Sequence, residues 1–121
     1  MNTSRFKGCG TALITPFRDG KVDYEAFAAL VDRQVAGGID FLVPLGTTGE
    51  TPCLTDEEKI DILHLTKDHA AGLPIVAGVG TNSLEHTIAN IKLLEPHGVD
   101  AFLVVVPYYN KPPQEGMYQY Y

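Results

Sequence analysis

The sequence predicts an α/β fold in which parallel strands alternate with helices, and three observations support this. Four short apolar runs recur at intervals of roughly thirty residues along the 121-residue chain. The runs are almost continuously apolar, as strands of a parallel sheet covered on both faces are. Helical patterns with capping residues fill the intervals between the runs. The predicted order is therefore β-α-β-α-β-α-β, with short loops and right-handed crossovers.

Each predicted strand corresponds to one apolar run. The runs are 10–15 (G-T-A-L-I-T), 40–45 (D-F-L-V-P-L), 74–79 (P-I-V-A-G-V) and 100–106 (D-A-F-L-V-V-V). Pro44 cannot donate to a ladder, but it stands near the end of its run, where the cost is limited. Residues 37–45 resemble residues 97–106, two βα units later. Repetition of βα units is typical of a (β/α)8 barrel, although a doubly wound sheet alternates in the same way.

Two helices are bounded by clear capping signals. The first is predicted after the N-cap Asp23, and it ends at the glycine pair 37–38. Its apolar stripe consists of Tyr24, Phe27, Leu30, Val31 and Val35. The second opens with a capping box formed by Thr55 and Glu58, and it closes at Gly72.

A third and a fourth helix follow. The third is predicted to begin at Ser83 and to end near Pro96. Its apolar face carries Leu84, Ile88 and Ile91. Near the end of the chain, Met117, Tyr120 and Tyr121 have the i, i+3, i+4 spacing of a helix that begins a buried face. We expect this fourth helix to be truncated, so that residues 1–121 form part of one larger domain.

Composition excludes several classes of function. The net charge of −6 leaves no basic stripe for nucleic acid. No apolar run approaches the ~18 residues of a membrane span, and the N-terminus lacks the apolar core of a signal peptide, so we expect a cytoplasmic protein. Cys9 and Cys53 form no C-x-x-C pair, and the four histidines lack ligand spacing. The cysteines are interpreted as plain buried or loop thiols, with no metal site.

Glycines, hydroxyls and amides gather where the predicted strands end. Gly46-Thr-Thr-Gly-Glu50 follows the second run, and residues 78–82 and 107–111 follow the third and fourth. In parallel α/β folds the ligand lies at these carboxyl ends. The segment 46–50 is either a turn, in which glycines supply positive φ, or a cradle for an anion. A threonine hydroxyl is a poor base, but it can pass a proton between stronger groups.

Two motifs carry a family resemblance. G-T-T-G-E after the second run resembles the signature of the class I pyruvate-dependent aldolase superfamily, and P-Y-Y-N-K-P-P-Q-E-G-M-Y-Q (107–119) after the fourth is similar to its dihydrodipicolinate synthase family. The resemblance covers the chain from Gly8 onward. It implies the first half of a (β/α)8 TIM barrel, about four βα units, in a lyase that condenses pyruvate with aspartate 4-semialdehyde in lysine and diaminopimelate biosynthesis.

The resemblance also implies roles for individual residues. Thr47 matches a threonine of a proton relay, and Thr47 with Thr48 matches the site of the pyruvate carboxylate. Tyr109 matches a tyrosine that reaches into a neighbouring subunit, so that a homodimer or homotetramer is expected. No cofactor is implied, because a lysine imine with pyruvate does the chemistry. The resemblance implies that this lysine lies on a later barrel strand, beyond Tyr121. The six lysines present all lie outside the apolar runs, and none is a credible substitute.

A lysine feedback site is implied as well. Asn82 and Tyr108 match positions of this allosteric site. The chain departs from the family pattern at Lys59, which stands with Asp56 where two histidines are expected, and at His86, which stands where an acidic residue is expected. A cation at Lys59 repels an ammonium group, so we expect weak or absent inhibition by lysine.

Two alternatives remain open. An N-acetylneuraminate lyase or a ketodeoxygluconate-type aldolase belongs to the same superfamily, but usually varies the first threonine or the residues after the glycine and lacks the Tyr-Tyr-Asn-basic-Pro stretch. In a reading of another class, the chain is a catalytically inert half-barrel that self-associates through its open edges and apolar interior.

Overall fold

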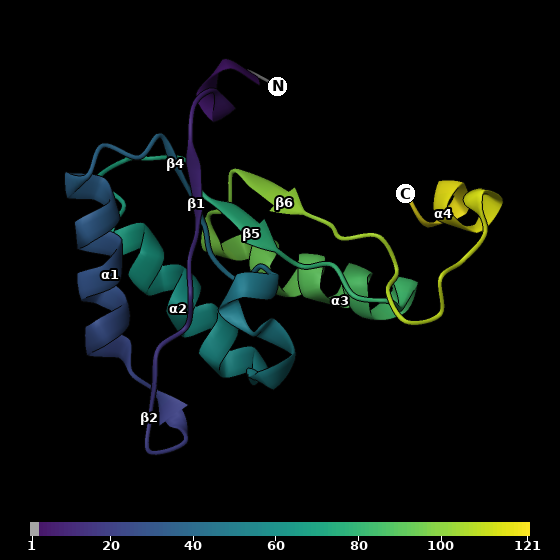
Figure 1. The fold of residues 1–121 in the computed structure, drawn as a ribbon, viewed down its shortest axis with the longest axis horizontal. Coiled ribbons are helices and arrows are strands. Elements are labelled where there is room, and N and C mark those ends of the chain that lie inside the picture. Colours follow the sequence, from purple (N-terminus) through teal and green to yellow (C-terminus); the bar gives the residue numbers. More distant parts are fainter. Residues whose placement is uncertain (1–2) are drawn as a thin grey trace.

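The computed structural model describes residues 3–121, apart from the side chain of Thr3, and it confirms the alternation of strands and helices (Figure 1). The strands are β1 (Gly10–Ala12), β2 (Phe17–Arg18), β3 (Lys21–Val22), β4 (Phe41–Val43), β5 (Val76–Gly78) and β6 (Ala101–Leu103). The α-helices are α1 (Tyr24–Ala36), α2 (Asp56–His69), α3 (Leu84–Leu94) and α4 (Gln114–Tyr120), and the 3-10 helices are η1 (Thr3–Phe6), η2 (Thr47–Gly49), η3 (Thr51–Cys53) and η4 (Glu95–His97).

The four predicted strands lie side by side and parallel, in chain order. β1 pairs with β4 and β5 pairs with β6, and a single parallel bridge between Leu42 and Ile75 joins the two pairs. Each ladder spans three residues, which is shorter than the predicted runs. β4 ends before Pro44, which has no N–H to offer. Beyond the ladders the backbone still pairs, since Leu13 N donates to Val43 O at 3.0 Å.

The two similar segments, 37–45 and 97–106, each make the same contact at the start of a strand pair. The Asp40 carboxylate accepts from Cys9 N at 2.7 Å, and Asp40 N donates to Cys9 O at 3.0 Å. Asp100 does the same with Ile75, at 2.9 and 3.0 Å. Both aspartates directly precede the second strand of their pair. The resemblance of 37–45 to 97–106 therefore reflects one aspartate clamp, used at β1–β4 and again at β5–β6.

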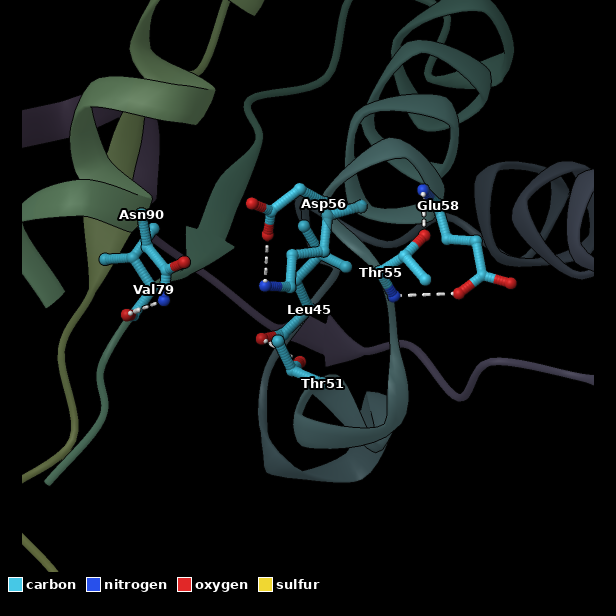
Figure 2. Close-up of polar contacts among 8 residues, drawn as sticks. Leu45, Thr51, Thr55, Asp56, Glu58, Val79 and Asn90 are labelled. Atoms are coloured by element: carbon cyan, nitrogen blue, oxygen red, sulfur yellow. Dashed lines mark hydrogen bonds and ion pairs between the residues drawn. The ribbon is translucent and has the colours of Figure 1, made fainter. Parts of the chain in front are cut away.

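The predicted helix caps are confirmed. Asp23 accepts from Ala26 N at 3.0 Å at the start of α1. Thr55 and Glu58 form the reciprocal capping box at the start of α2, drawn in Figure 2, with bonds of 2.8 and 3.2 Å. Ser83 accepts from His86 N at 3.4 Å at the start of α3. These signals are local in the sequence, which is why they could be identified without the fold.

The predicted apolar face of α3 is only partly correct. Leu84 and Ile88 are 45% and 41% exposed, and Ile91 is half-buried. The helix instead buries Thr87 and Leu94. Its rotation is set by polar contacts with the end of β5, because Thr87 bonds to the segment after that strand and the Asn90 amide donates to a strand-end carbonyl.

A short antiparallel hairpin was not predicted. β2 and β3 pair around Asp19 and Gly20, whose φ angles are 52° and 76°. An Asp-Gly pair with both residues left-handed is a favoured two-residue hairpin turn. The D-G dipeptide at 19–20 was the available signal.

The hydrophobic core lies between the strands and α1, α2 and α3, which gather on one side of them (Figure 1). Its largest fully buried side chains include Leu13 and Leu42 from the strand region, Phe27 from α1, Ile62 from α2 and Leu94 from α3. α4 is set apart, at the end of the long segment after β6 (Figure 1).

The fourth helix begins earlier than its apolar positions suggested, and its face is only partly buried. Within it Met117 and Tyr120 are half-buried, but Tyr121 is 67% exposed, against the prediction. Cys9 and Cys53 are exposed free thiols, in agreement with the loop alternative.

Candidate functional site

A hollow of about 350 Å³ opens at the carboxyl ends of β4, β5 and β6. This is the edge where parallel strands place their ligands. The lining residues are mostly apolar or glycine, with a few hydroxyls. They are Leu45, Gly46, Thr47, Thr51, Pro52, Gly78, Val79, Gly80, Leu103, Val105 and Tyr108. The hollow therefore brings together the three loops that the sequence singled out.

The G-T-T-G-E segment forms a 3-10 turn on the rim of this hollow. Thr47 and Thr48 are both exposed, and Thr47 lines the hollow. The left-handed residues are not the glycines: Leu45 and Glu50 have φ of 61° and 53°, whereas Gly46 has φ of −76°. The prediction that glycines supply the positive φ of this segment is therefore wrong, because Leu45 and Glu50 adopt it instead.

Two hydroxyls outside the motif are bonded to the backbone of this loop. The Thr51 hydroxyl donates to Leu45 O at 2.6 Å (Figure 2). It also lies 3.1 Å from Gly46 O. The Thr15 hydroxyl donates to Gly49 O at 2.7 Å in a buried position. Thr15 is the last residue of the first predicted strand, and Thr51 directly follows the G-T-T-G-E motif. Their bonding partners were not predicted.

The glycines after β5 have a packing role. A Cβ at Gly78 would overlap the Leu45 carbonyl, and a Cβ at Gly80 would overlap Val105 N. Both obstacles are backbone atoms, which cannot rotate away. Glycine is required at both positions because neighbouring strands approach closely there.

The two tyrosines after β6 lie in different surroundings. Tyr108 lines the hollow, whereas Tyr109 is 90% exposed, with φ of 68°, and is not among the lining residues. The structure thus brings Thr47 and Tyr108 together at the hollow, and it leaves Thr48 and Tyr109 outside the lining.

Asn82 belongs to a second hollow of about 280 Å³, between the start of α3 and α4. Its amide donates weakly to Asn110 Oδ1 at 3.5 Å. Tyr120 lines the same hollow, and its hydroxyl donates to Thr81 O at 2.7 Å and lies 2.7 Å from Thr87 Oγ1. This bond joins α4 to the start of α3. Sequence reasoning gave Tyr120 only an apolar role, because its partners lie more than thirty residues earlier.

Charged groups are absent from the lining of the first hollow, among the residues that the structure describes. None of the six lysines lines it. Lys59 is ion-paired to Asp56 at 2.9 Å. Within residues 3–121 no three His, Cys, Asp or Glu side chains are grouped to hold a metal ion. The same part of the chain contains no helix with the length and hydropathy that a membrane crossing needs.

Known proteins resemble the chain over nearly its whole length. Residues 5–121 match the model of the family described as "Dihydrodipicolinate synthetase family". The 4-hydroxy-tetrahydrodipicolinate synthases of Parabacteroides distasonis and Thermotoga neapolitana are 56% and 47% identical to the chain, over 100% and 96% of it. The chain spans only 41% and 40% of those two proteins.

Solved structures give the same result. The dihydrodipicolinate synthase of Thermotoga maritima superimposes with a TM-score of 0.93 at 44% identity, over 97% of this chain and 40% of that one. The enzyme of Cyanidioschyzon merolae, solved with lysine bound, gives 0.89 at 38% identity, with 96% and 40% covered. A 2-keto 3-deoxygluconate aldolase from Picrophilus torridus gives 0.86 at 34% identity, with 96% and 42% covered.

Proposed function

The chain belongs to the dihydrodipicolinate synthetase family, and from this premise we propose that it forms the first half of a (β/α)8 TIM barrel in a lyase. The lyase condenses pyruvate with aspartate 4-semialdehyde. The observation that carries the proposal is the hollow at the carboxyl ends of three parallel strands, with Thr47 on its rim. The remaining βα units correspond to the part of the relatives that this chain does not span.

The nucleophile of the reaction lies outside this chain. A Schiff base needs an amine that is unprotonated and close to the bound keto acid. No lysine of the described residues lines the hollow, and Lys59 is held by Asp56. The chain alone is therefore inactive. It contributes residues that bind and orient pyruvate and that relay a proton.

Thr47 and Thr48 receive the pyruvate carboxylate, and Thr47 also relays a proton. A hydroxyl donates one hydrogen bond and accepts others, so it can hand on a proton without becoming a base. The hollow is mostly apolar, which strengthens a hydrogen bond to a carboxylate. Both threonines are exposed to the solvent side of the loop, where a small ligand can reach them.

Tyr109 completes the relay in a second copy of the chain. Its side chain is 90% exposed and is not among the lining residues of its own hollow, which supports a role across an interface. The active assembly is then a homodimer or a homotetramer. Regulation through Asn82 and Tyr108 by lysine is weak or absent, since Lys59 and Asp56 stand where the family pattern has two histidines, and a cation there repels the ammonium group of lysine. A lysine titration of the complete enzyme that gave strong inhibition would contradict this.

A second candidate is a 2-keto 3-deoxygluconate-type aldolase. The likeness to the enzyme of that name from Picrophilus torridus supports it. Such an enzyme would also form a pyruvate imine. The two candidates differ in the aldehyde that reacts with pyruvate, so comparing turnover of aspartate 4-semialdehyde with turnover of a sugar-derived aldehyde separates them. Turnover of a sialic acid would in the same way identify an N-acetylneuraminate lyase.

Borohydride trapping with pyruvate, followed by intact mass, tests whether the chain lacks the nucleophile. We expect no adduct on the 121-residue chain. A stoichiometric adduct would assign the Schiff base to one of the six lysines here and overturn the division of roles. Sedimentation at several concentrations then decides whether the inert chain forms a defined dimer or heterogeneous aggregates.

A chimaera tests the roles of the residues that are present. The chain is joined to the part of the Parabacteroides distasonis relative that it does not span. We expect the chimaera to condense pyruvate with aspartate semialdehyde. Thr47→Val should lower kcat by roughly a hundredfold, because a relay step typically contributes 10²–10⁴-fold. Thr47→Ser keeps the hydroxyl and should retain most of the activity. Equal activity of the valine and serine variants would remove Thr47 from the relay.

A further inference from the structure

Two hydroxyls hold the loop that carries Thr47 and Thr48, and each comes from a different element. Thr15 follows β1, is 4% exposed and donates to Gly49 O at 2.7 Å. Thr51 begins η3 and donates to Leu45 O at 2.6 Å. One bond therefore fixes the end of the loop and the other fixes its start.

The loop between these bonds has an unfavourable backbone. Leu45 and Glu50 have φ of 61° and 53°, in the left-handed region that residues with a side chain avoid. Such a conformation persists only where the surrounding structure over-determines it, and it is found most often at ligand sites. These two residues flank Thr47 and Thr48, so a relaxation of either one would move both hydroxyls.

The two bonds oppose this relaxation. The Gly49 carbonyl lies in a buried position with Thr15, so loss of the hydroxyl leaves a buried acceptor without its partner. The Leu45 carbonyl belongs to the left-handed residue itself, so the Thr51 bond acts directly on the strained peptide. Neither hydroxyl is a member of the G-T-T-G-E motif.

We infer that Thr15 and Thr51 are positioning residues of the candidate site. Their hydroxyls hold the loop in the conformation that places Thr47 on the lining of the hollow and leaves Thr48 exposed beside it. The inference rests on the proposed function, because it takes those two threonines as the groups that receive pyruvate.

Amide hydrogen exchange of the 121-residue chain tests the loop itself. The N–H groups of Gly49 and Glu50 close the turn with bonds of 2.9 and 3.1 Å. In Thr15→Val and Thr51→Val we expect both amides to exchange about tenfold faster, the effect of losing one hydrogen bond. The serine variants at the same positions retain the hydroxyl and should stay within about twofold of the native chain.

Thr66→Val is the matched control. Thr66 is also fully buried, and its hydroxyl donates to a helix carbonyl, Ile62 O, at 2.7 Å, in α2. Its loss should leave exchange in the loop unchanged. Faster exchange of Gly49 and Glu50 in this control, or unchanged exchange in both valine variants at 15 and 51, would overturn the inference.

A pyruvate titration, followed by the amide chemical shifts of Thr47 and Thr48, links the loop to the ligand. We expect pyruvate to bind about tenfold more weakly to Thr15→Val and Thr51→Val than to the native chain, with affinity restored in the serine variants. Equal affinity in a valine variant whose loop has loosened overturns the positioning role. If the native chain gives no response to pyruvate, ligand binding by this chain fails as a proposal, while the exchange data still decide whether the two hydroxyls hold the loop.

Discussion

The two edges of the parallel sheet are built on different principles. At the amino edge the same aspartate clamp occurs twice, with Asp40 holding Cys9 and Asp100 holding the backbone of Ile75. At the carboxyl edge every loop differs, and the backbone includes left-handed residues such as Leu45. A clamp that repeats serves the fold. Left-handed residues with a side chain occur at both edges, since Ala71 precedes β5, but more of them follow the strands, at Leu45, Glu50, Tyr109 and Lys111, and backbone strain of this kind often clusters at ligand sites.

The largest effect expected is at Gly78, on the carboxyl edge. A Cβ there would overlap the Leu45 carbonyl, so Gly78→Ala should lower the free energy of unfolding by about 3 kcal/mol. The matched control is Gly10→Ala on the amino edge, where a Cβ would meet the end of the Phe41 ring, which can rotate. We expect that change to cost about 1 kcal/mol. Chemical denaturation measures the free energy of unfolding of both variants. Equal losses would mean that the backbone at the carboxyl edge accommodates an added Cβ as easily as the Phe41 ring does at the amino edge.

The two aspartate clamps should differ in strength. Asp100 accepts from Ile75 N and also pairs with Arg5 at 2.7 Å, and its side chain is mostly shielded. Asp100→Ala should therefore cost about 2 kcal/mol, since it leaves a backbone donor without a charged acceptor. Asp40 is exposed, and Asp40→Ala should cost about 1 kcal/mol.

Thermal unfolding of the two single variants and of the double variant checks this order. Additive costs would support two independent clamps, because the sites share no partner. A larger loss for Asp40→Ala would contradict the role assigned to shielding.

Glu50 offers a gain of stability. Its φ of 53° is unfavourable for a residue with a side chain, so Glu50→Gly should raise the free energy of unfolding by roughly 0.5 kcal/mol. The same change relieves strain in the loop, and we expect pyruvate to bind less tightly to the variant. Greater stability with weaker binding would indicate that the strain serves the ligand, whereas unchanged binding would indicate that it does not.

The smallest effect concerns Tyr24, away from both edges. Burial raises the pKa of the Tyr24 hydroxyl above its ordinary value of 10.0, and Asp61, which accepts its hydrogen bond at 3.3 Å, raises this pKa further. The neutral phenol is thus favoured in the folded state. Its contribution is complete below about pH 10 and is lost as the pH rises through the raised value.

Tyr24→Phe should cost roughly 0.5 kcal/mol or less near neutral pH, and the difference from the native chain should vanish at strongly alkaline pH. Denaturation at several pH values between neutral and strongly alkaline measures this. Tyr118→Phe, in the exposed part of α4, is the control, and it should leave the pH dependence unchanged.

Signals local in the sequence predicted much of the fold. The caps at Asp23, Thr55 and Ser83 were identified because each acts within one helical turn. The order of strands followed from the apolar runs and from the rules for parallel connections. Strand lengths were overestimated, since an apolar run continues past the last ladder bond, as at Pro44.

The location of the candidate site in the fold could be predicted, but its hydrogen bonds and backbone conformation could not. Thr47 was predicted to lie on the ligand edge because parallel strands bring their carboxyl ends together. The hydrogen bond from Thr15 to Gly49 joins residues that are 34 positions apart, and no sequence pattern in either segment predicts it. The left-handed Leu45 could not be predicted either, because it adopts a conformation that its residue type avoids and its carbonyl is bonded by Thr51, which lies outside the G-T-T-G-E motif.

The aspartate clamps have a consequence for recombination between relatives. Each aspartate bonds the backbone of the first strand of its own pair, but Asp100 also pairs with Arg5, which precedes β1. A crossover point in the α2 region therefore leaves each aspartate with the strand that it bonds, but it separates Arg5 from Asp100. In a library of shuffled family genes, surviving hybrids with a junction between β4 and β5 should therefore retain a basic residue at position 5 wherever they retain the aspartate at position 100.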